Sequence, residues 1–329
     1  MQFNTINGND LVQSCVNDFE GTVLQVYRHQ IAENELYKAY HDALHIDVER
    51  VNALTDIPFL PISFFKSHKV KSFRGNVESV IFDSSGTSGM IPSRHYVLDE
   101  QLYDSVSLNG FEQYYGESKD WVILALLPSY LERKTSSLVH MANMLMKKSG
   151  NPDGGFYLNE FEELSRKIKS LQSERRKILL LGVTFALLDF AEAYPMDLSG
   201  VTVMETGGMK GRKEEWTREQ VHQFLKEKWN LKTVHAEYGM TELLSQAYAK
   251  ENGLFKPIHT MRALVRDVQD PLETKTSGSG VLNIIDLANV HSCSFIATED
   301  MGKVNADGTF EVLGRMDFAA LRGCSLMAV

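Results

Sequence analysis

The chain has 329 residues, which is long enough for one large α/β domain or for two ordinary domains. Its formal net charge is −9 and no long run of one sign occurs, so we do not expect nucleic acid as a partner. The start, Met1–Asp10, lacks a signal-peptide pattern, and the apolar runs are too short to span a bilayer. We therefore expect a cytoplasmic protein without a membrane span. Three widely spaced cysteines fit neither a disulfide framework nor a zinc site: Cys15, Cys293 and Cys324.

The predicted elements begin with helices and then alternate between strands and helices. Spaced apolar residues predict two helices over about 10–44, and a turn-rich aromatic segment follows at 57–65. Short, fully apolar strands that alternate with helices are typical of a mostly parallel sheet covered by helices. The predicted strands cover 80–82, 121–127, 178–181, 201–204 and 233–236, and the predicted helices cover 99–115, 135–148, 161–172, 184–193 and 214–229.

After about residue 255 the pattern changes to short strands separated by glycine-marked turns, with strands predicted at 281–286, 294–297 and 309–313. We therefore expect an α/β fold with three parts. An N-terminal helical segment, 1–75, belongs to the same domain as an α/β core, 76–254. A β-rich subdomain with a truncated C-terminal tail covers 255–329.

The hexapeptide Ser84-Ser85-Gly86-Thr87-Ser88-Gly89 follows a predicted strand and is the strongest local signal. Glycines let the backbone approach a phosphate closely, and the hydroxyl groups supply hydrogen-bond donors. It is not a Walker A loop, because no Gly-Lys-Ser/Thr follows. A flexible surface turn has the same composition, so the hexapeptide alone is compatible with both interpretations.

Four further segments place polar or glycine residues near predicted strands. In Tyr238-Gly239-Met240-Thr241-Glu242, an aromatic face could stack on a purine, a hydroxyl could reach a phosphate and a carboxylate could hold Mg²⁺. The pair Gly207-Gly208 could admit a flat base against the backbone. Asp300 could chelate ribose hydroxyls, and Arg315 could reach the ribose or the α-phosphate. Each segment alone is equally compatible with an ordinary loop.

In this order, the five segments resemble the motifs of the adenylate-forming superfamily, which contains acyl-CoA synthetases, luciferases and peptide-synthetase adenylation domains. The resemblance extends from about Phe82 to Gly323. It implies a large adenylate-forming N-terminal domain, with mostly parallel sheets covered by helices and a β-rich subdomain. It also implies ATP and Mg²⁺ as cofactors and an acyl-AMP as the product of the first step.

The resemblance also implies roles for individual residues. Thr241 would bind the α-phosphate and Glu242 would hold Mg²⁺, which makes these two residues catalytic. Tyr238 would pack on adenine, while Asp300 and Arg315 would fix the ribose. The residues expected to bind the nucleotide and its phosphates are Ser84, Ser85, Gly86, Thr87, Ser88, Gly89, Gly207, Gly208, Tyr238, Gly239, Asp300 and Arg315.

Other segments resemble the acyl-protein synthetases of bacterial luminescence systems. These are 58–68, Ser93-Arg94-His95, 128–133 and Arg322-Gly323-Cys324-Ser325. Those enzymes activate a long-chain fatty acid with ATP and pass the acyl group to protein cysteines, including one on a partner reductase. The resemblance therefore implies a fatty acid substrate and an acyl-accepting reductase as partner.

The end of the sequence differs from the general superfamily pattern. There, the Gly-Arg-x-Asp motif leads into a small domain with a catalytic lysine, whereas here six residues follow Gly323 and no lysine follows Lys303. We therefore expect the small C-terminal domain to be missing and the acyl group to leave by another route. Cys324 is a candidate acyl acceptor, because chain termini are rarely buried. Cys15 and Cys293 are expected to be buried and inert.

Two alternative functions stay open at this point. The loop and the Tyr-Gly-x-Thr-Glu spacing also resemble acyl- or aryl-CoA ligases similar to phenylacetate-CoA ligase. A non-catalytic scaffold subunit could keep the fold and lack the lysine. The sequence leaves open the identity of the acid, the choice between CoA and a protein thiol, and association into a homo-oligomer.

Overall fold

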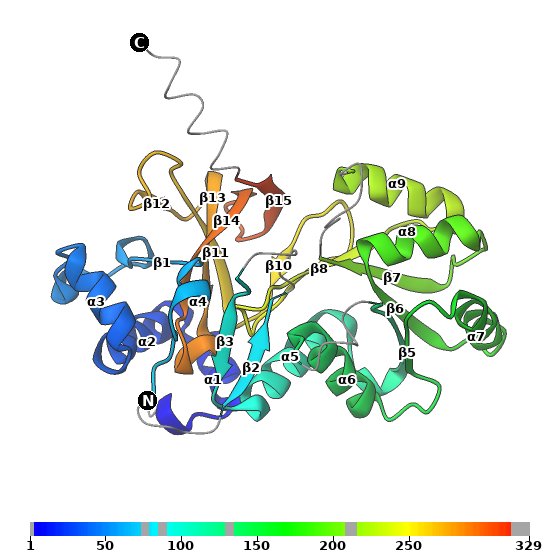
Figure 1. Ribbon diagram of the computed structural model, residues 1–329, viewed down its shortest axis with the longest axis horizontal. Coiled ribbons are helices and arrows are strands. Elements are labelled where there is room, and N and C mark those ends of the chain that lie inside the picture. The colour runs from blue at the N-terminus through cyan, green and yellow to red at the C-terminus, as the bar shows by residue number, and fades with distance from the viewer. Residues whose placement is uncertain (1–2, 74–78, 85–90, 129–134, 208–215, 317–329) are drawn as a thin grey trace, which may run out of the picture.

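The computed structural model describes residues 3–73, 79–84, 91–128, 135–207 and 216–316. The described residues form a larger sheet, a smaller sheet and a separate β-hairpin, with helices packed around them (Figure 1). The larger sheet is mostly parallel and the smaller one mostly antiparallel. The predicted fold class, an α/β core with a β-rich part, is confirmed.

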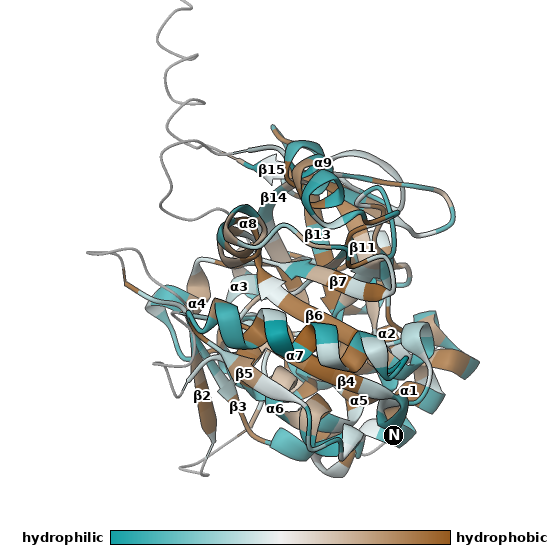
Figure 2. Cartoon of the chain, turned by 90° about the vertical axis from the view of Figure 1, so that its right-hand side faces the viewer, coloured by the Kyte–Doolittle hydropathy of each residue, from teal (hydrophilic) through white to brown (hydrophobic). Residues whose placement is uncertain are grey.

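The larger sheet has seven strands, and its middle is apolar and covered on both faces. Every residue of β4 is buried, and Figure 2 shows β4 and β6 as hydrophobic bands. The five neighbouring strands β5, β4, β6, β7 and β8 run parallel to one another. At the β8 edge, β9 pairs antiparallel with β8, and β10 pairs antiparallel with β9. In spatial order the strands are β10 (Lys256–Pro257), β9 (Ala247–Ala249), β8 (His235–Tyr238), β7 (Val201–Thr206), β6 (Lys177–Val183), β4 (Trp121–Leu126) and β5 (Gly155–Tyr157).

Helices that connect these strands pack on the sheet or on one another. Helix α6 packs on β4, α7 and α8 pack on β6, and α9 packs on α8. Helix α9 begins where the Thr217 hydroxyl and the Gln220 side chain form a capping box, and it ends at Asn230 in the left-handed conformation. The helices are α5 (Glu100–Tyr115), α6 (Ser137–Ser149), α7 (Phe161–Ser173), α8 (Thr184–Ala193) and α9 (Arg218–Trp229).

The smaller sheet contains most of the C-terminal strands and one strand from the N-terminal part. Strand β1 (Leu60–Pro61) lies parallel to β14 and precedes the short helix α4 (Phe64–Ser67), while the other pairs are antiparallel. The sequence reasoning missed β11. The remaining strands are β14 (Phe295–Val304), β13 (Gly278–Asp286), β11 (Met261–Arg266), β12 (Thr274–Lys275) and β15 (Phe310–Arg315), and β2 (Val80–Asp83) and β3 (Arg94–Val97) form the hairpin.

The N-terminal segment contains three helices, so the prediction of two over residues 10–44 was wrong. Asp18 and Asn34 separate the helices, because each side chain accepts a hydrogen bond from the first turn of the helix that follows it. The helices are α1 (Gly8–Asn17), α2 (Phe19–Glu33) and α3 (Glu35–Ala43), and short 3₁₀ helices occur at Phe3–Thr5, Val48–Arg50, Leu54–Asp56, Ser118–Asp120 and Leu287–His291.

These first helices pack on the C-terminal sheet, far away in the sequence. The Gln30 amide donates to the carbonyl oxygens of Asn289 and Val290, and the Asn34 amide donates to the carbonyl oxygen of Ser292. All five residues are buried, so the bonds replace contacts with water. The N-terminal helices therefore help to fix the 3₁₀ helix 287–291.

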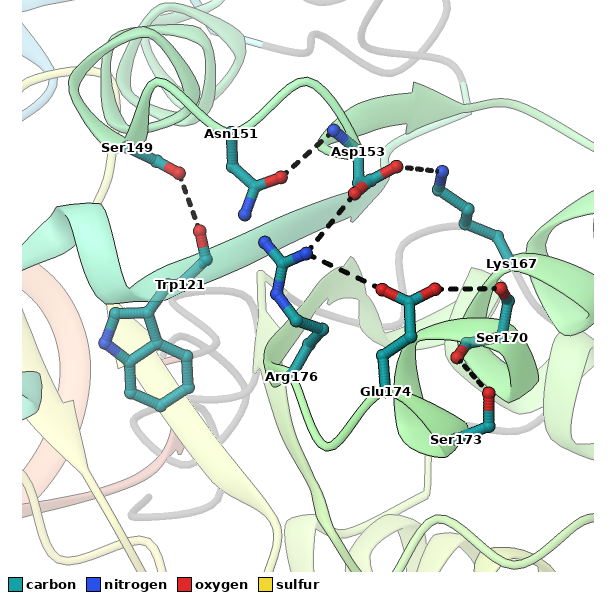
Figure 3. A network of polar contacts seen from close by, with 9 residues as sticks. All are labelled: Trp121, Ser149, Asn151, Asp153, Lys167, Ser170, Ser173, Glu174 and Arg176. Atoms are coloured by element: carbon teal, nitrogen blue, oxygen red, sulfur yellow. Dashed lines mark hydrogen bonds and ion pairs between the residues drawn. The ribbon is translucent and has the colours of Figure 1, made fainter.

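A network of polar side chains lies at the edge of the larger sheet that is formed by β5 (Figure 3). Asp153 accepts a hydrogen bond from Lys167 of α7 at 2.6 Å and lies 3.6 Å from Arg176, which precedes β6. The Ser149 hydroxyl, at the end of α6, donates to the carbonyl oxygen of Trp121. An open surface hollow of about 600 Å³ adjoins this network and is lined by residues between 152 and 167. None of the predicted site residues lines it.

Candidate active site

Three predicted site residues meet where the two sheets face each other. Tyr238 ends β8, and Asp300 and Arg315 are paired across β14 and β15. The Tyr238 hydroxyl donates to Asp300 Oδ2 at 2.9 Å, and Arg315 Nε lies 3.4 Å from Asp300 Oδ1. The Asp300 side chain is 11% exposed, whereas that of Arg315 is 64% exposed. The guanidinium therefore remains accessible to an anionic ligand.

The Tyr238 ring is held by two other aromatic side chains. It packs edge-on against Phe310 and tilted against Phe255, and the Phe255 and Phe310 rings stack on each other. Burial, and then the nearby Asp300 charge, raises the pKa of Tyr238 well above its usual value, so its hydroxyl stays a donor. With only 8% of Tyr238 exposed, most of its ring contacts protein. The predicted contact with adenine would use the small part of the Tyr238 ring that stays exposed.

Glu242 follows β8 and lies close to the neck of the Ser/Gly-rich loop. Its side chain is buried, and the Ser93 side chain lies close enough to stabilise the charged carboxylate. Burial raises the pKa of Glu242, although Ser93 and the positive charges of Arg315 and Lys66 oppose that shift. A cation beside this carboxylate would replace the solvation that burial removes.

The donor set fits Mg²⁺ that is bound together with a nucleotide. Among the described residues, no group of three or more His, Cys, Asp or Glu side chains is arranged to hold a metal by itself. Mg²⁺ commonly binds one or two carboxylates and completes its coordination with substrate phosphates and water. Glu242 is the carboxylate that could serve in this way.

The hairpin β2–β3 brings Ser84 and Ser93 together. The Ser84 backbone N–H donates to the Ser93 carbonyl oxygen at 3.0 Å, and the Ser93 N–H donates to Ser84 Oγ at 2.8 Å. Ser84 therefore shapes the neck of the loop. Of the predicted phosphate-binding residues in this loop, Ser85, Gly86, Thr87, Ser88 and Gly89 lie outside the described residues.

Gly207 directly follows the neighbouring strand, β7. It has a positive φ of 76°, and its carbonyl oxygen accepts a hydrogen bond from the Thr184 hydroxyl at 3.1 Å. Gly239 follows β8, where a Cβ atom would overlap the Glu237 carboxylate, so a side chain there would have to displace that carboxylate. Gly208 lies outside the described residues. The carboxyl ends of parallel strands, where these residues lie, are the usual ligand sites of such sheets.

The sequence reasoning missed two buried acids on these strands. Glu205 accepts hydrogen bonds from Thr184 and Arg218, and Glu237 accepts one from the Thr206 hydroxyl. Burial raises the pKa of Glu237 to about 7, with Thr206 opposing the shift and the Glu205 charge adding to it. Isolated acids within strands form no spacing pattern, so no sequence signal indicated them.

Two cysteines have the environment that the sequence predicted. Cys15 and Cys293 are buried free thiols, and burial raises the pKa of each to about 12. Because the thiolate is the nucleophile, both are unreactive near neutral pH. Cys324 lies outside the described residues, as does most of the segment 128–133.

A family model described as "Acyl-protein synthetase, LuxE" matches residues 13–113. That range contains two of the segments on which the predicted resemblance rests, 58–68 and Ser93-Arg94-His95. No curated protein matches the chain.

Solved structures match over a larger part of the chain. A 2-hydroxyisobutyryl-CoA ligase in complex with 2-HIB-AMP and CoA is 12% identical, with a TM-score of 0.67, over 91% of this chain and 74% of that one. The chain has the fold of the adenylate-forming ligases. A long-chain-fatty-acid-CoA ligase from Archaeoglobus fulgidus (16% identity, TM-score 0.52) and a luciferase-like enzyme from Zophobas morio (16%, 0.51) each match 75% of this chain. The chain spans 53% and 60%, respectively, of their lengths.

The predicted resemblance to the adenylate-forming superfamily, and to its acyl-protein synthetases, is therefore confirmed. The likeness to the solved structures concerns the fold, at these low identities. In the described part of the chain, no helix combines the length and the apolar character needed to cross a membrane.

Proposed function

We propose that this protein uses ATP to convert a fatty acid to its acyl-AMP and then transfers the acyl group to a protein cysteine. The acyl-protein synthetase match and the adenylate-forming fold support activation through an acyl-AMP. The description of that family also supports a protein as acyl acceptor. We propose that the acceptor is a cysteine, on a reductase that would reduce the acyl group.

One observation carries the proposal, namely that motifs far apart in the sequence converge. Tyr238, Asp300 and Arg315 are joined through one carboxylate. Glu242 lies near both that group and the loop neck, because Arg315 and Ser93 each oppose the rise in the pKa of its carboxyl group. The side chains predicted to bind the ribose, the phosphates and Mg²⁺ would therefore lie next to one another, as a bound nucleotide requires.

The first half-reaction needs positioning and charge stabilisation more than covalent catalysis. A carboxylate oxygen of the acid would attack the α-phosphorus of ATP, and the bond from that phosphorus to the bridging oxygen would break to release pyrophosphate. Thr241 would donate to the α-phosphate, and Arg315 and Asp300 would hold the ribose. Mg²⁺ bound at Glu242 would neutralise charge on the leaving phosphates.

In the second half-reaction, a thiolate would attack the acyl carbon and AMP would leave. The two buried cysteines, Cys15 and Cys293, are poor candidates because their raised pKa values keep them protonated. Cys324 or a cysteine of the partner reductase would then be the acceptor.

The second candidate function is that of an acyl- or aryl-CoA ligase. It is favoured by the solved structures with the same fold, two of which are CoA ligases by name. In that case CoA would replace the protein thiol, and the first half-reaction would be unchanged.

The decisive experiment is ATP–pyrophosphate exchange across a panel of carboxylic acids, with and without CoA. We expect exchange with long-chain fatty acids in the absence of any partner, and no stimulation of AMP release by CoA. CoA-dependent AMP release would instead support the CoA ligase. The complete lack of exchange with every acid would support a non-catalytic scaffold.

A further inference from the structure

Two buried side chains hold the backbone of the proposed catalytic pair. His95 Nδ1 lies 2.8 Å from the carbonyl oxygen of Thr241, and Asn289 Nδ2 donates to the carbonyl oxygen of Glu242 over the same distance. His95 belongs to β3, whereas Asn289 belongs to the 3₁₀ helix 287–291 of the C-terminal part. Consecutive carbonyl groups are thus held by two separate parts of the fold.

The other polar atom of each side chain is buried without a protein partner. Within the described ranges, His95 Nε2, Asn289 Oδ1 and His291 Nδ1 have no hydrogen-bond partner. Leaving such an atom unpaired costs about 1–3 kcal/mol. All three residues line one small, partly open cavity of about 10 Å³, which is roughly the space for a single water molecule.

The chemistry of these atoms defines what the cavity can hold. A carbonyl oxygen can only accept, so His95 must carry its proton on Nδ1, and its Nε2 is then an acceptor. Asn289 uses its amide nitrogen for Glu242, so its free Oδ1 is also an acceptor. The occupant must therefore supply two donors, and it can accept a third bond from His291 Nδ1–H.

A water molecule meets these requirements, whereas a metal cation would need more oxygen ligands than the cavity offers. Burial lowers the pKa of His95 to about 4, with the Thr241 carbonyl opposing the shift, so the ring is neutral at pH 7 and keeps the acceptor.

We propose that His95 and Asn289 bind one buried water molecule and, together with it, act as positioning residues for the Thr241–Glu242 backbone. The role of these residues in catalysis rests on the proposed function. The water site and the rigidity of the Thr241–Glu242 backbone do not depend on that function. Asn289 in turn belongs to a helix whose carbonyl groups are held by Gln30 of α2. The N-terminal helices therefore support the site through this contact.

The test compares variants that remove one or both of the hydrogen bonds made by these side chains. In His95→Asn, the amide nitrogen can replace Nδ1 as donor to Thr241, but the acceptor for the water is lost. Asn289→Leu has a similar size and loses both bonds. His41→Asn is the matched control, because His41 is another buried histidine, paired with Tyr27 among the N-terminal helices.

Amide hydrogen exchange is measured on the segment 241–245, where the N–H groups of Leu244 and Ser245 bond to Asp286. We expect at least about fivefold faster exchange there in His95→Asn and Asn289→Leu, since one lost hydrogen bond costs about 1 kcal/mol or more. The His41→Asn control should leave this segment unchanged. Unchanged exchange in both site variants would overturn the proposal.

A high-resolution crystal structure of the wild-type chain tests the water directly, even where a variant does not fold. Density for one water within hydrogen-bond distance of His95 Nε2 and Asn289 Oδ1 supports the proposal, and an empty or side-chain-filled cavity overturns it. In pyrophosphate exchange, both variants should lose at least about tenfold in kcat, with less than about threefold change in KM for ATP. A wild-type protein without exchange would refute the function while leaving the two structural tests valid.

Discussion

The Tyr238 hydroxyl donates a hydrogen bond to Asp300 Oδ2 across 62 positions of sequence, while the other oxygen of that carboxylate faces Arg315. The carboxylate is thus oriented from both sides by groups on β8 and β15. Such orientation prepares it to accept hydrogen bonds from a diol such as ribose, and Asp300 is the residue at which ATP affinity can be tested most directly.

Asp300→Ala should weaken ATP binding more than it slows the reaction. A contact with ribose contributes about equally in the ground and transition states, so KM for ATP should rise about tenfold to a hundredfold while kcat changes little. Steady-state kinetics of pyrophosphate exchange measure both constants. Asp42→Ala, which removes an exposed carboxylate paired with Lys38, is the control. A normal KM with a reduced kcat would give Asp300 a different role.

Glu242→Gln should nearly abolish acyl-AMP formation and leave the fold intact. Glutamine has the same shape and can keep the contact with the Ser93 hydroxyl, but it cannot supply the negative charge for Mg²⁺. Loss of a well-placed electrostatic contact typically costs about 10²–10³ in rate. Exchange rates and circular dichroism check the two statements, with Glu227→Gln on α9 as control. A variant that retains more than about half of the rate would remove Glu242 from the metal site.

The stability of the protein should depend on pH through Glu237. Its pKa is about 7 in the folded state and about 4.3 in an unfolded chain, so the folded state holds a proton that the unfolded chain releases between these values. This contribution is complete below about pH 4.3 and is lost as pH rises through 7.

Glu237→Gln removes this dependence, because glutamine cannot ionise but can still accept from Thr206. From pH 5 to pH 8, the free energy of unfolding of the variant should rise relative to wild type by roughly 1–3 kcal/mol. Urea denaturation at both pH values measures the difference, and Glu227→Gln should show no such trend. A constant difference between Glu237→Gln and wild type would mean that Glu237 does not titrate in this range.

Labelled fatty acid and ATP should label the protein itself if Cys324 accepts the acyl group. The label should be sensitive to hydroxylamine, as a thioester is, and should be lost in Cys324→Ser while pyrophosphate exchange persists. Cys15→Ala should keep the label, because that thiol is buried and protonated. Labelling that persists in Cys324→Ser would exclude this residue and favour direct delivery to a partner.

Much of the fold follows from local sequence patterns. The apolar runs predicted β4, β6 and β7, because strands buried on both faces consist mostly of apolar residues. The count of N-terminal helices was wrong, because the caps Asp18 and Asn34 lie within a continuous helical pattern. Strand β11 was missed, since its short apolar run stands between turns without a helix to mark it.

The order of motifs along the chain was enough to predict the adenylate-forming fold and to name Tyr238, Asp300 and Arg315. Tertiary structure alone decided that one carboxylate links these residues, that Ser93 contacts Glu242, and that His95 and Asn289 hold neighbouring carbonyl groups. The physical reason is that propensity and periodicity act over a few residues, whereas these contacts form when the hairpin, the parallel sheet and the C-terminal strands pack together. Burial in the packed structure then sets the protonation of Glu237 and His95, which local sequence does not reveal.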